Sequence, residues 1–260
     1  MHGEHKATTL KGYRGNMITC SRISISVNAS IQKEMPFGLG NTLFMIAGTI
    51  GIATKNGYSF GFEEWPSQEF FINPLPKLDD TKFAIHYVPR DYHDFDICFQ
   101  GFDVPDNSNI HGYLGSWKYF DHCKDLIRHY FTMKKITEPY KDCVIISYRD
   151  YYQTEWAKLD QEYYLRALSH FPNKRVIVVT NNPEVAYKAI QLDCAYIHNS
   201  PIVDFYLLSN ADYIVMANST FSWWGAWLSK AKVVAPLNWF AGGFSDCPTK
   251  DLYCPEWILE

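Results

Sequence analysis

Small polar side chains gather in one turn of the chain, where residues 218–222 read Asn-Ser-Thr-Phe-Ser. An apolar run at 213–217 precedes the turn and predicts a buried strand, and residues 221–229 predict a helix after it. A strand, a hydroxyl-rich turn and a helix N-terminus together hold phosphate, because backbone N–H groups and the positive helix end point at one place. The same pattern is typical of a capped core helix, so two interpretations stay open at this point.

Three tryptophans, Trp223, Trp224 and Trp227, lie close behind this turn. Aromatic side chains at this density suit either a tightly packed core or a wall for a flat ligand. We expect packing that fixes the helix, and we place the chemistry at the turn in front of it.

Two further polar segments follow apolar runs. Arg149 and Asp150 come after residues 143–148, and the pair Asn181–Asn182 comes after residues 175–180. Strands that alternate with helices predict a parallel sheet covered on both faces, and ligands bind such sheets at the carboxyl ends of the strands. We therefore expect a nucleotide at this edge. The other elements expected here are helices at 159–171, 183–192 and 203–209, and strands at 195–197 and 232–235.

The N-terminal part is less regular. Residues 1–17 lack periodicity and are expected to be a loose lead-in, whereas residues 22–27 alternate polar and apolar side chains and predict a strand. Gly38 and Gly40 then precede an apolar helix at 42–55. Two glycines at a strand-to-helix turn let the backbone approach a ligand closely, although many such turns need glycine only for a positive φ.

Asp94 and Asp96 form an Asp-x-Asp pair of the kind that can hold a metal bound to a nucleotide diphosphate. One pair falls short of a full ligand set, and two carboxylates in a loop are more often simply solvated. We expect no metal site and no cofactor.

Composition narrows the class of protein. The chain has 260 residues, 47% of them hydrophobic and 17% aromatic, which fits a globular protein that binds sugars or bases. Its net charge of −4 argues against nucleic acid as a partner. The 7 cysteines are scattered, the N-terminus is polar and no apolar run is long enough to span a membrane. We expect a cytoplasmic protein without a membrane segment.

With these segments in view, the sequence resembles the inverting alpha-1,2-fucosyltransferases, which depend on GDP-fucose. The match runs from about residue 38 to the C-terminus, and its last long segment is the most specific. The segments that carry the resemblance are Gly38 to Phe44, Gly112 to Phe120, Val144 to Tyr151, Asp204 to Ser209, Asn218 to Leu228 and Val234 to Phe240.

The resemblance implies an α/β fold of the GT-B type, with two Rossmann-like lobes that face each other across a cleft. Residues 1–138 would form the acceptor-side lobe, residues 139–238 the lobe that binds the GDP-sugar, and residues 239–260 a segment that packs back on the first lobe. It also implies metal-independent transfer of L-fucose, with inversion, from GDP-beta-L-fucose to a sugar hydroxyl. We expect the 2-hydroxyl of a galactoside-type acceptor.

The resemblance also suggests roles for single residues. Arg149 would hold the diphosphate of the donor, and Asn41 would lie beside the transferred sugar. Asp150 is a candidate general base, although a salt-bridge partner is the simpler role for it. The other residues expected to bind the donor are Gly38, Gly40, Asn182, Ser219, Thr220, Phe221 and Ser222.

Several positions depart from the family pattern, among them the run Arg149–Asp150, which is shorter than the family's. Ser147 stands where the family has histidine, Thr42 replaces a glutamine, and Asn181–Asn182 replace an aspartate pair that can contact guanine. A lost carboxylate weakens recognition of guanine, although the amide oxygen of Asn182 could still accept one hydrogen bond. Two alternatives therefore stay open, a transferase for another GDP-sugar and a catalytically silent module that binds nucleotide-sugars or glycans.

Overall fold

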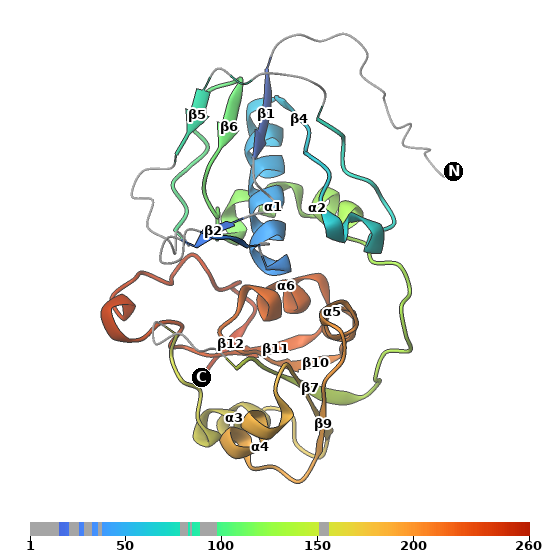
Figure 1. Ribbon diagram of the computed structural model, residues 1–260. Helices are drawn as coiled ribbons and strands as arrows, with labels where there is room; N and C mark the ends of the chain where they lie inside the picture. Colours follow the sequence, from blue (N-terminus) through green and yellow to red (C-terminus); the bar gives the residue numbers. More distant parts are fainter. Residues whose placement is uncertain are drawn as a thin grey trace.

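The computed structural model is an α/β protein with two parallel sheets (Figure 1). The structure describes residues 16–20, 26–28, 33–35, 38–78, 83, 85–88, 98–150 and 156–260. Asp94 and Asp96 lie outside these residues.

The larger sheet lies in the C-terminal half and has six strands in the order β12-β11-β10-β7-β8-β9, all parallel. Read from β9, this is the order 3-2-1-4-5-6 of dinucleotide-binding sheets, in which the strand order reverses between the first and fourth strands while all strands stay parallel. Here that switch point lies between β7 and β10. The strands are β7 (Cys143–Tyr148), β8 (Arg175–Thr180), β9 (Ala195–Ile197), β10 (Tyr213–Val215), β11 (Lys232–Ala235) and β12 (Ile258–Leu259).

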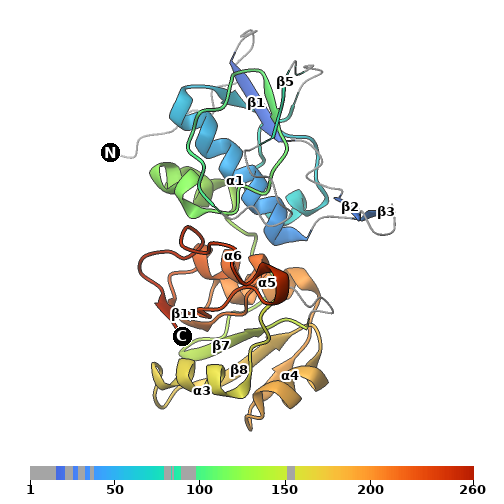
Figure 2. The same ribbon diagram turned by 90° about the vertical axis from the view of Figure 1, so that its left-hand side faces the viewer.

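Helices cover both faces of this sheet, as Figures 1 and 2 show. On the outer face lie α3 (Gln161–Ser169) and α4 (Pro183–Ile190), and on the face toward the N-terminal half lie α5 (Pro201–Ser209) and α6 (Thr220–Leu228). The apolar, largely β-branched runs of the inner strands explain this arrangement, because a strand buried on both faces needs no polar side. The parallel, helix-covered sheet expected from the sequence is confirmed.

The smaller sheet lies in the N-terminal half and has four parallel strands in the order β4-β1-β6-β5. They are β1 (Met17–Cys20), β4 (Ser59–Phe60), β5 (Ile85–Tyr87) and β6 (Ser108–Ile110). A separate antiparallel pair is formed by β2 (Ser26–Asn28) and β3 (Lys33–Met35). Of the strand predicted at 22–27, residues 22–25 lie outside the described residues and 26–27 belong to β2, whereas β1 was not predicted. Four residues are too few to show a periodicity, and pairing on both sides by β4 and β6 is what holds this strand.

Helix α1 (Leu39–Asn56) links the two halves. It begins against α6 and runs along the smaller sheet to Gly57, whose φ of 71° ends the helix in a left-handed cap. Beside it lies α2 (Lys124–Tyr130). Four short 3₁₀ helices complete the described elements: η1 (Pro66–Phe70), η2 (Trp117–Tyr119), η3 (Asp121–Cys123) and η4 (Gly242–Phe244).

The buried side chains form two clusters. One runs from the smaller sheet through α1 and α6 to the inner face of the larger sheet, and the other lies under α3 and α4. The two halves therefore share one core through α1 and α6. The tryptophans of α6 belong to it, because Trp223 and Trp224 are fully buried and Trp223 Nε1 donates to the carbonyl of Leu252 at 2.7 Å. The packing interpretation of these side chains is correct.

The last twenty residues contact both halves. β12 adds a strand to the larger sheet, whereas Asp251 binds residues before and after β6. Its carbonyl accepts from Ser116 Oγ at 2.7 Å, its carboxylate accepts from Lys118 Nζ at 2.5 Å, and the same carboxylate accepts from the Phe99 N–H at 3.2 Å. The domain boundaries inferred from the sequence stay a prediction.

Candidate functional site

Three polar segments meet at the carboxyl edge of the larger sheet. Tyr148 is paired in register with Thr180, and Val215 is paired with Ile146, so β7, β8 and β10 end side by side. Arg149 therefore emerges next to the residues that follow β8 and β10. This is the switch point of the sheet, where α/β folds of this strand order bind ligands.

Arg149 points from the end of β7 toward the start of α6. Its guanidinium carbon lies over the Phe221 ring, 4.4 Å from the ring centroid, which is within the range of a cation–π interaction. No described carboxylate forms an ion pair with it. The charge of Arg149 acts on Asp204 of α5, which is 1% exposed.

Asp204 is a buried acid of α5 to which the sequence pattern assigns no role. Burial raises the pKa of its carboxyl, and the hydrogen bond from Asn199 and the positive charges of Arg149 and His198 oppose that rise. Asn199 Nδ2 donates to Asp204 Oδ1 at 3.0 Å. A single acid inside the otherwise apolar 203–209 pattern was the signal that could have drawn attention to it.

Asp150 turns the other way, toward the end of β8. Its backbone N–H donates to Asn181 Oδ1 at 2.8 Å, and Asn181 Nδ2 donates back to the Asp150 carbonyl at 3.2 Å. Asn182 Nδ2 donates to Asp150 Oδ2 at 2.9 Å. The described partners of Asp150 are thus the two asparagines and not Arg149, and the salt-bridge role suggested for it stays a prediction.

The side chain of Asn182 is engaged at both ends. Its Oδ1 accepts from the Val185 N–H at 3.3 Å and so caps α4, while its Nδ2 binds Asp150. The amide oxygen expected to accept from a base is therefore already turned toward the helix. Direct contact of Asn182 with a donor stays a prediction that competes with this cap.

The hydroxyl groups at the start of α6 are used inside the protein. Ser219 Oγ accepts from the Phe221 N–H at 3.2 Å, and the Ser222 and Ser147 hydroxyl oxygens lie 2.7 Å apart with both residues buried. The Ser147 departure thus pairs with Ser222 across β7 and α6. An anion at this turn would meet backbone N–H groups and not these two hydroxyls.

Helix α1 begins directly against the start of α6. A Cβ on Gly40 would lie 2.4 Å from the Thr220 carbonyl carbon and 2.5 Å from the Phe221 nitrogen, so only glycine allows this approach. Thr220 Oγ1 donates to Asn41 Oδ1 at 2.7 Å. Gly38, the N-cap residue of α1, is exposed and makes no side-chain cap. The structure thus brings the glycine turn and the Asn-Ser-Thr turn together.

Two helix N-termini therefore converge beside one arginine. Neither α1 nor α6 has an acidic residue in its first turn, and no described residue accepts a hydrogen bond from the N–H of Asn41 or Thr220. Each N-terminus carries about half a positive charge, so the junction is a focus of positive potential at the switch point. An anion with more than one negative charge is the ligand that such a junction favours.

Asn218 holds this junction in place from behind. Its Nδ2 donates to the carbonyls of Ala157 at 2.7 Å and Trp239 at 2.9 Å, which ties the loops after β7 and β11 to the start of α6. Its side chain is buried, so its role here is positioning.

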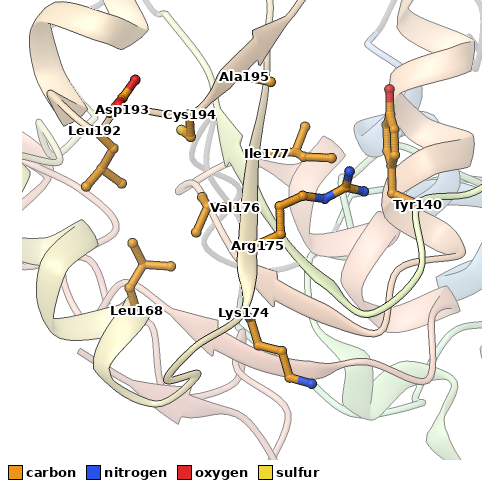
Figure 3. Close-up of a pocket in the computed structure, with 10 residues that line it drawn as sticks. All are labelled: Tyr140, Leu168, Lys174, Arg175, Val176, Ile177, Leu192, Asp193, Cys194 and Ala195. Carbon is orange, nitrogen blue, oxygen red and sulfur yellow. The ribbon is translucent and has the colours of Figure 1, made fainter.

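A cavity of about 520 Å³ lies at the opposite, amino edge of the same sheet (Figure 3). Its lining comes from the starts of β8 and β9 and from the segment before β7, with Arg175 turned toward Tyr140. Ligands of such sheets bind at the carboxyl edge, so this cavity is separate from the junction at Arg149.

Within the described ranges, no group of three or more His, Cys, Asp or Glu side chains could hold a metal ion. A search of the same ranges for a helix long and apolar enough to cross a membrane also found none.

Comparison with known proteins identifies the part of the chain that carries the switch point. Residues 143–260 match the model of glycosyl transferase family 11. The matched segment begins at the first residue of β7 and contains Arg149, Asn182 and the start of α6, whereas Gly40 and Asn41 lie before it.

Two Escherichia coli proteins are similar to parts of the chain. An alpha-1,2-colitosyltransferase is 46% identical over 59 residues, which are 20% of this chain and 20% of that protein. The O-antigen biosynthesis glycosyltransferase WbnK is 31% identical over 157 residues, which are 59% of this chain and 39% of that protein. The aligned parts thus span well under half the length of either relative.

A solved heptosyltransferase shows a distant likeness. The dodecameric iron-containing TibC, in complex with ADP-D-beta-D-heptose, superposes with a TM-score of 0.47 at 15% sequence identity, over 99% of this chain and 67% of that chain. A likeness at this level assigns neither a ligand nor the way the two halves face each other.

Proposed function

We propose that this chain is a glycosyltransferase that moves L-fucose from GDP-beta-L-fucose to a sugar hydroxyl. The observation that carries the proposal is the convergence of Arg149 with the N-termini of α1 and α6 at the switch point of the segment that matches family 11. A nucleotide-sugar offers this junction a diphosphate, the multiply charged anion that its potential favours. The acceptor would be the 2-hydroxyl of a galactoside, in keeping with the alpha-1,2 linkage in the name of one relative.

In this proposal, the acceptor oxygen forms a bond to the anomeric carbon as the bond from that carbon to the diphosphate breaks. The electron pair leaves on the diphosphate, the acceptor's proton passes to a base, and the configuration inverts. Charge builds on the phosphate oxygens during departure. Arg149, held over the Phe221 ring, and the Thr220 N–H, which no described residue accepts from, are donors that stabilise this charge without reorganising.

The proposal places the donor against the larger sheet and the acceptor on the side of the smaller sheet, as in a GT-B enzyme. Asn41 supports this arrangement, because it belongs to the N-terminal half and yet touches Thr220. It would lie where the sugar leaves the diphosphate. No metal is needed in this scheme, because Arg149 and the helix ends supply the positive charge.

A different donor sugar is the second candidate. The 46% identity to an alpha-1,2-colitosyltransferase favours another GDP-linked deoxysugar, such as colitose, over the same diphosphate site. A screen of GDP-fucose and other GDP-sugars, with linkage analysis of the product formed on a galactoside, separates the two. Nucleotide-sugar binding without any product would instead identify a silent binding module.

Arg149→Ala tests the proposal, and Arg128→Ala is its matched control. Arg128 of α2 lies 4.9 Å from the centroid of the Trp227 ring at the far end of α6. Its removal therefore also deletes an arginine that packs on an aromatic ring of α6. Arg149→Ala should lower transfer by orders of magnitude in a folded protein, whereas Arg128→Ala should leave transfer near the wild-type rate. Near-normal turnover in Arg149→Ala would refute the assignment.

A further inference from the structure

The carboxylate of Asp150 is held in one orientation, and the described residues give it fewer than a full set of hydrogen-bond partners. Asn181 clamps its backbone through two hydrogen bonds, and Asn182 Nδ2 donates to Oδ2. Among the residues that the structure describes, none donates to Oδ1 and none forms an ion pair with this carboxylate. An ionised carboxylate only accepts hydrogen bonds, so the open oxygen calls for N–H or O–H donors from a ligand.

The identity of the donor atom at Asn182 is fixed by the fold. Because Asn182 Oδ1 caps α4 by accepting from the Val185 N–H, its other end must be the NH₂ group that faces Asp150. The open Oδ1 of Asp150 is therefore the acceptor presented at the end of β8. Asn181 and Asn182 act as positioning residues for a carboxylate supplied by the neighbouring strand.

The distance to the positive junction suits a nucleotide. The start of α6 follows β10 and Asn182 follows β8, with β7 between them. Neighbouring strands lie about 4.8 Å apart, so the two positions are separated by about 10 Å along the sheet edge. Arg149 and Asp150, adjacent in sequence, turn toward opposite ends of this span. An extended nucleoside diphosphate bound with its phosphates at Arg149 would bring its base to Asp150.

We propose that Asp150 reads the base of the donor nucleotide, by accepting hydrogen bonds from the N1–H and the 2-amino group of guanine. Guanine is the base that presents two adjacent N–H donors on one edge, whereas adenine, cytosine and uracil place an acceptor beside their donor. The carboxylate that the asparagine pair lacks is thus supplied from the end of β7. The inference rests on the proposed function, and it assigns Asp150 to donor recognition rather than to proton transfer.

Nucleotide binding by the full chain tests this assignment. Wild-type protein should bind guanosine diphosphate about tenfold or more tightly than inosine diphosphate, which lacks the 2-amino group, because each hydrogen bond to a charged acceptor contributes at least that factor. It should prefer both to uridine diphosphate. Equal affinity for guanosine and inosine diphosphates in the wild type would overturn the inference.

Asp150→Asn should change which nucleotide the protein prefers, as well as lower its affinity for guanosine diphosphate. Asn182 Nδ2 keeps an acceptor facing it, so the introduced amide must turn its oxygen to Asn182 and its NH₂ to the ligand. This donor repels the 2-amino group of guanosine diphosphate and suits the C2 oxygen of xanthosine diphosphate. We expect the ratio of the affinities for guanosine and xanthosine diphosphates to shift by about a hundredfold, because one hydrogen bond is lost with the first ligand and one is gained with the second. The affinity for uridine diphosphate should stay within about twofold.

Asp193→Asn is the matched control, because Asp193 is an exposed aspartate at the opposite edge of the sheet. It should keep the wild-type order of affinities. In transfer assays, Asp150→Asn should raise the KM for the GDP-sugar and keep kcat at saturating donor. An unchanged preference among the three purine nucleotides, or a lost kcat with an unchanged KM, would overturn the inference.

The two proposals fail in different ways. Binding of every diphosphate that depends on Arg149 but not on Asp150 would leave the proposed function standing and remove this inference. Absence of nucleotide diphosphate binding in the folded wild type would remove both.

Discussion

The Thr220 hydroxyl donates a hydrogen bond to the side-chain oxygen of Asn41 at 2.7 Å, across 179 positions of the sequence. This contact joins the first turns of α1 and α6, which come from the two halves of the chain. Like ends of two helix dipoles meet there beside Arg149. The two positive helix ends repel each other, which destabilises the protein without ligand. Together they attract a bound anion.

Asn41→Asp should stabilise the protein without ligand and weaken its binding of nucleotide diphosphates. The new carboxylate would still accept from Thr220 and would place a negative charge at both helix N-termini, which stabilises the empty protein by about 0.3–1 kcal/mol. The same charge should weaken binding of guanosine diphosphate about tenfold or more, and less so as salt screens it. Thermal unfolding and calorimetric binding at two salt concentrations measure both effects.

Asn41→Ala is the control for that charge, because it removes the hydrogen bond and adds no carboxylate. It should destabilise the empty protein slightly and change nucleotide affinity without the salt dependence. If Asn41→Asp lowers stability and leaves affinity unchanged, the helix ends are not an anion site.

Gly40→Ala should force α1 away from α6. The added Cβ would lie 2.4 Å from backbone atoms of Thr220, and backbone cannot yield as a flexible side chain does. Overpacking of this kind costs about 1–3 kcal/mol, which corresponds to a fall of about 2–4 °C in Tm for each kcal/mol.

Gly38→Ala, two residues earlier, controls for the loss of a glycine. A Cβ there meets nothing within 4 Å, and its φ of −61° suits alanine. We expect only the small cost of replacing glycine at an N-cap. Equal losses in the two variants would show that the contact between α1 and Thr220 does not limit stability.

Asp251 should make the stability of the contact between the C-terminal segment and the N-terminal half depend on pH. Burial raises the pKa of its carboxyl, but the bond from Lys118, the Phe99 N–H and the charge of Lys250 outweigh burial, and the pKa lies below the ordinary 3.8. A depressed pKa contributes stability that is present above pH 3.8 and is lost as pH falls through the folded value.

The comparison of wild type with Asp251→Asn across pH measures this contribution. The variant should be less stable by about 1–3 kcal/mol at pH 7, and the difference should shrink once pH falls below 3.8. A difference in Tm that stays constant from pH 7 to pH 3 would assign the loss to packing rather than to the charge of Asp251.

Local patterns are enough to predict the parallel, helix-covered sheet of the C-terminal half. Apolar β-branched runs such as 175–180 predict strands buried on both faces, and Pro183 and the Asn-Ser-Thr turn mark where helices begin. The sequence also placed Arg149 and the start of α6 at one edge, because every parallel strand ends on the same side. These inferences need only local patterns and the geometry of one sheet.

The partner of each polar side chain follows from long-range packing. The order of the strands puts β7 between β8 and β10, and this order sends Arg149 to Phe221 and Asp150 to the asparagine pair. The meeting of Gly40 with Thr220 joins segments far apart in the chain, which no local pattern encodes. The sequence thus predicted which polar residues lie at the edge, and long-range packing selected their partners. A hydrogen bond depends on a distance and a direction, and residues that are neighbours in the sequence do not set these alone.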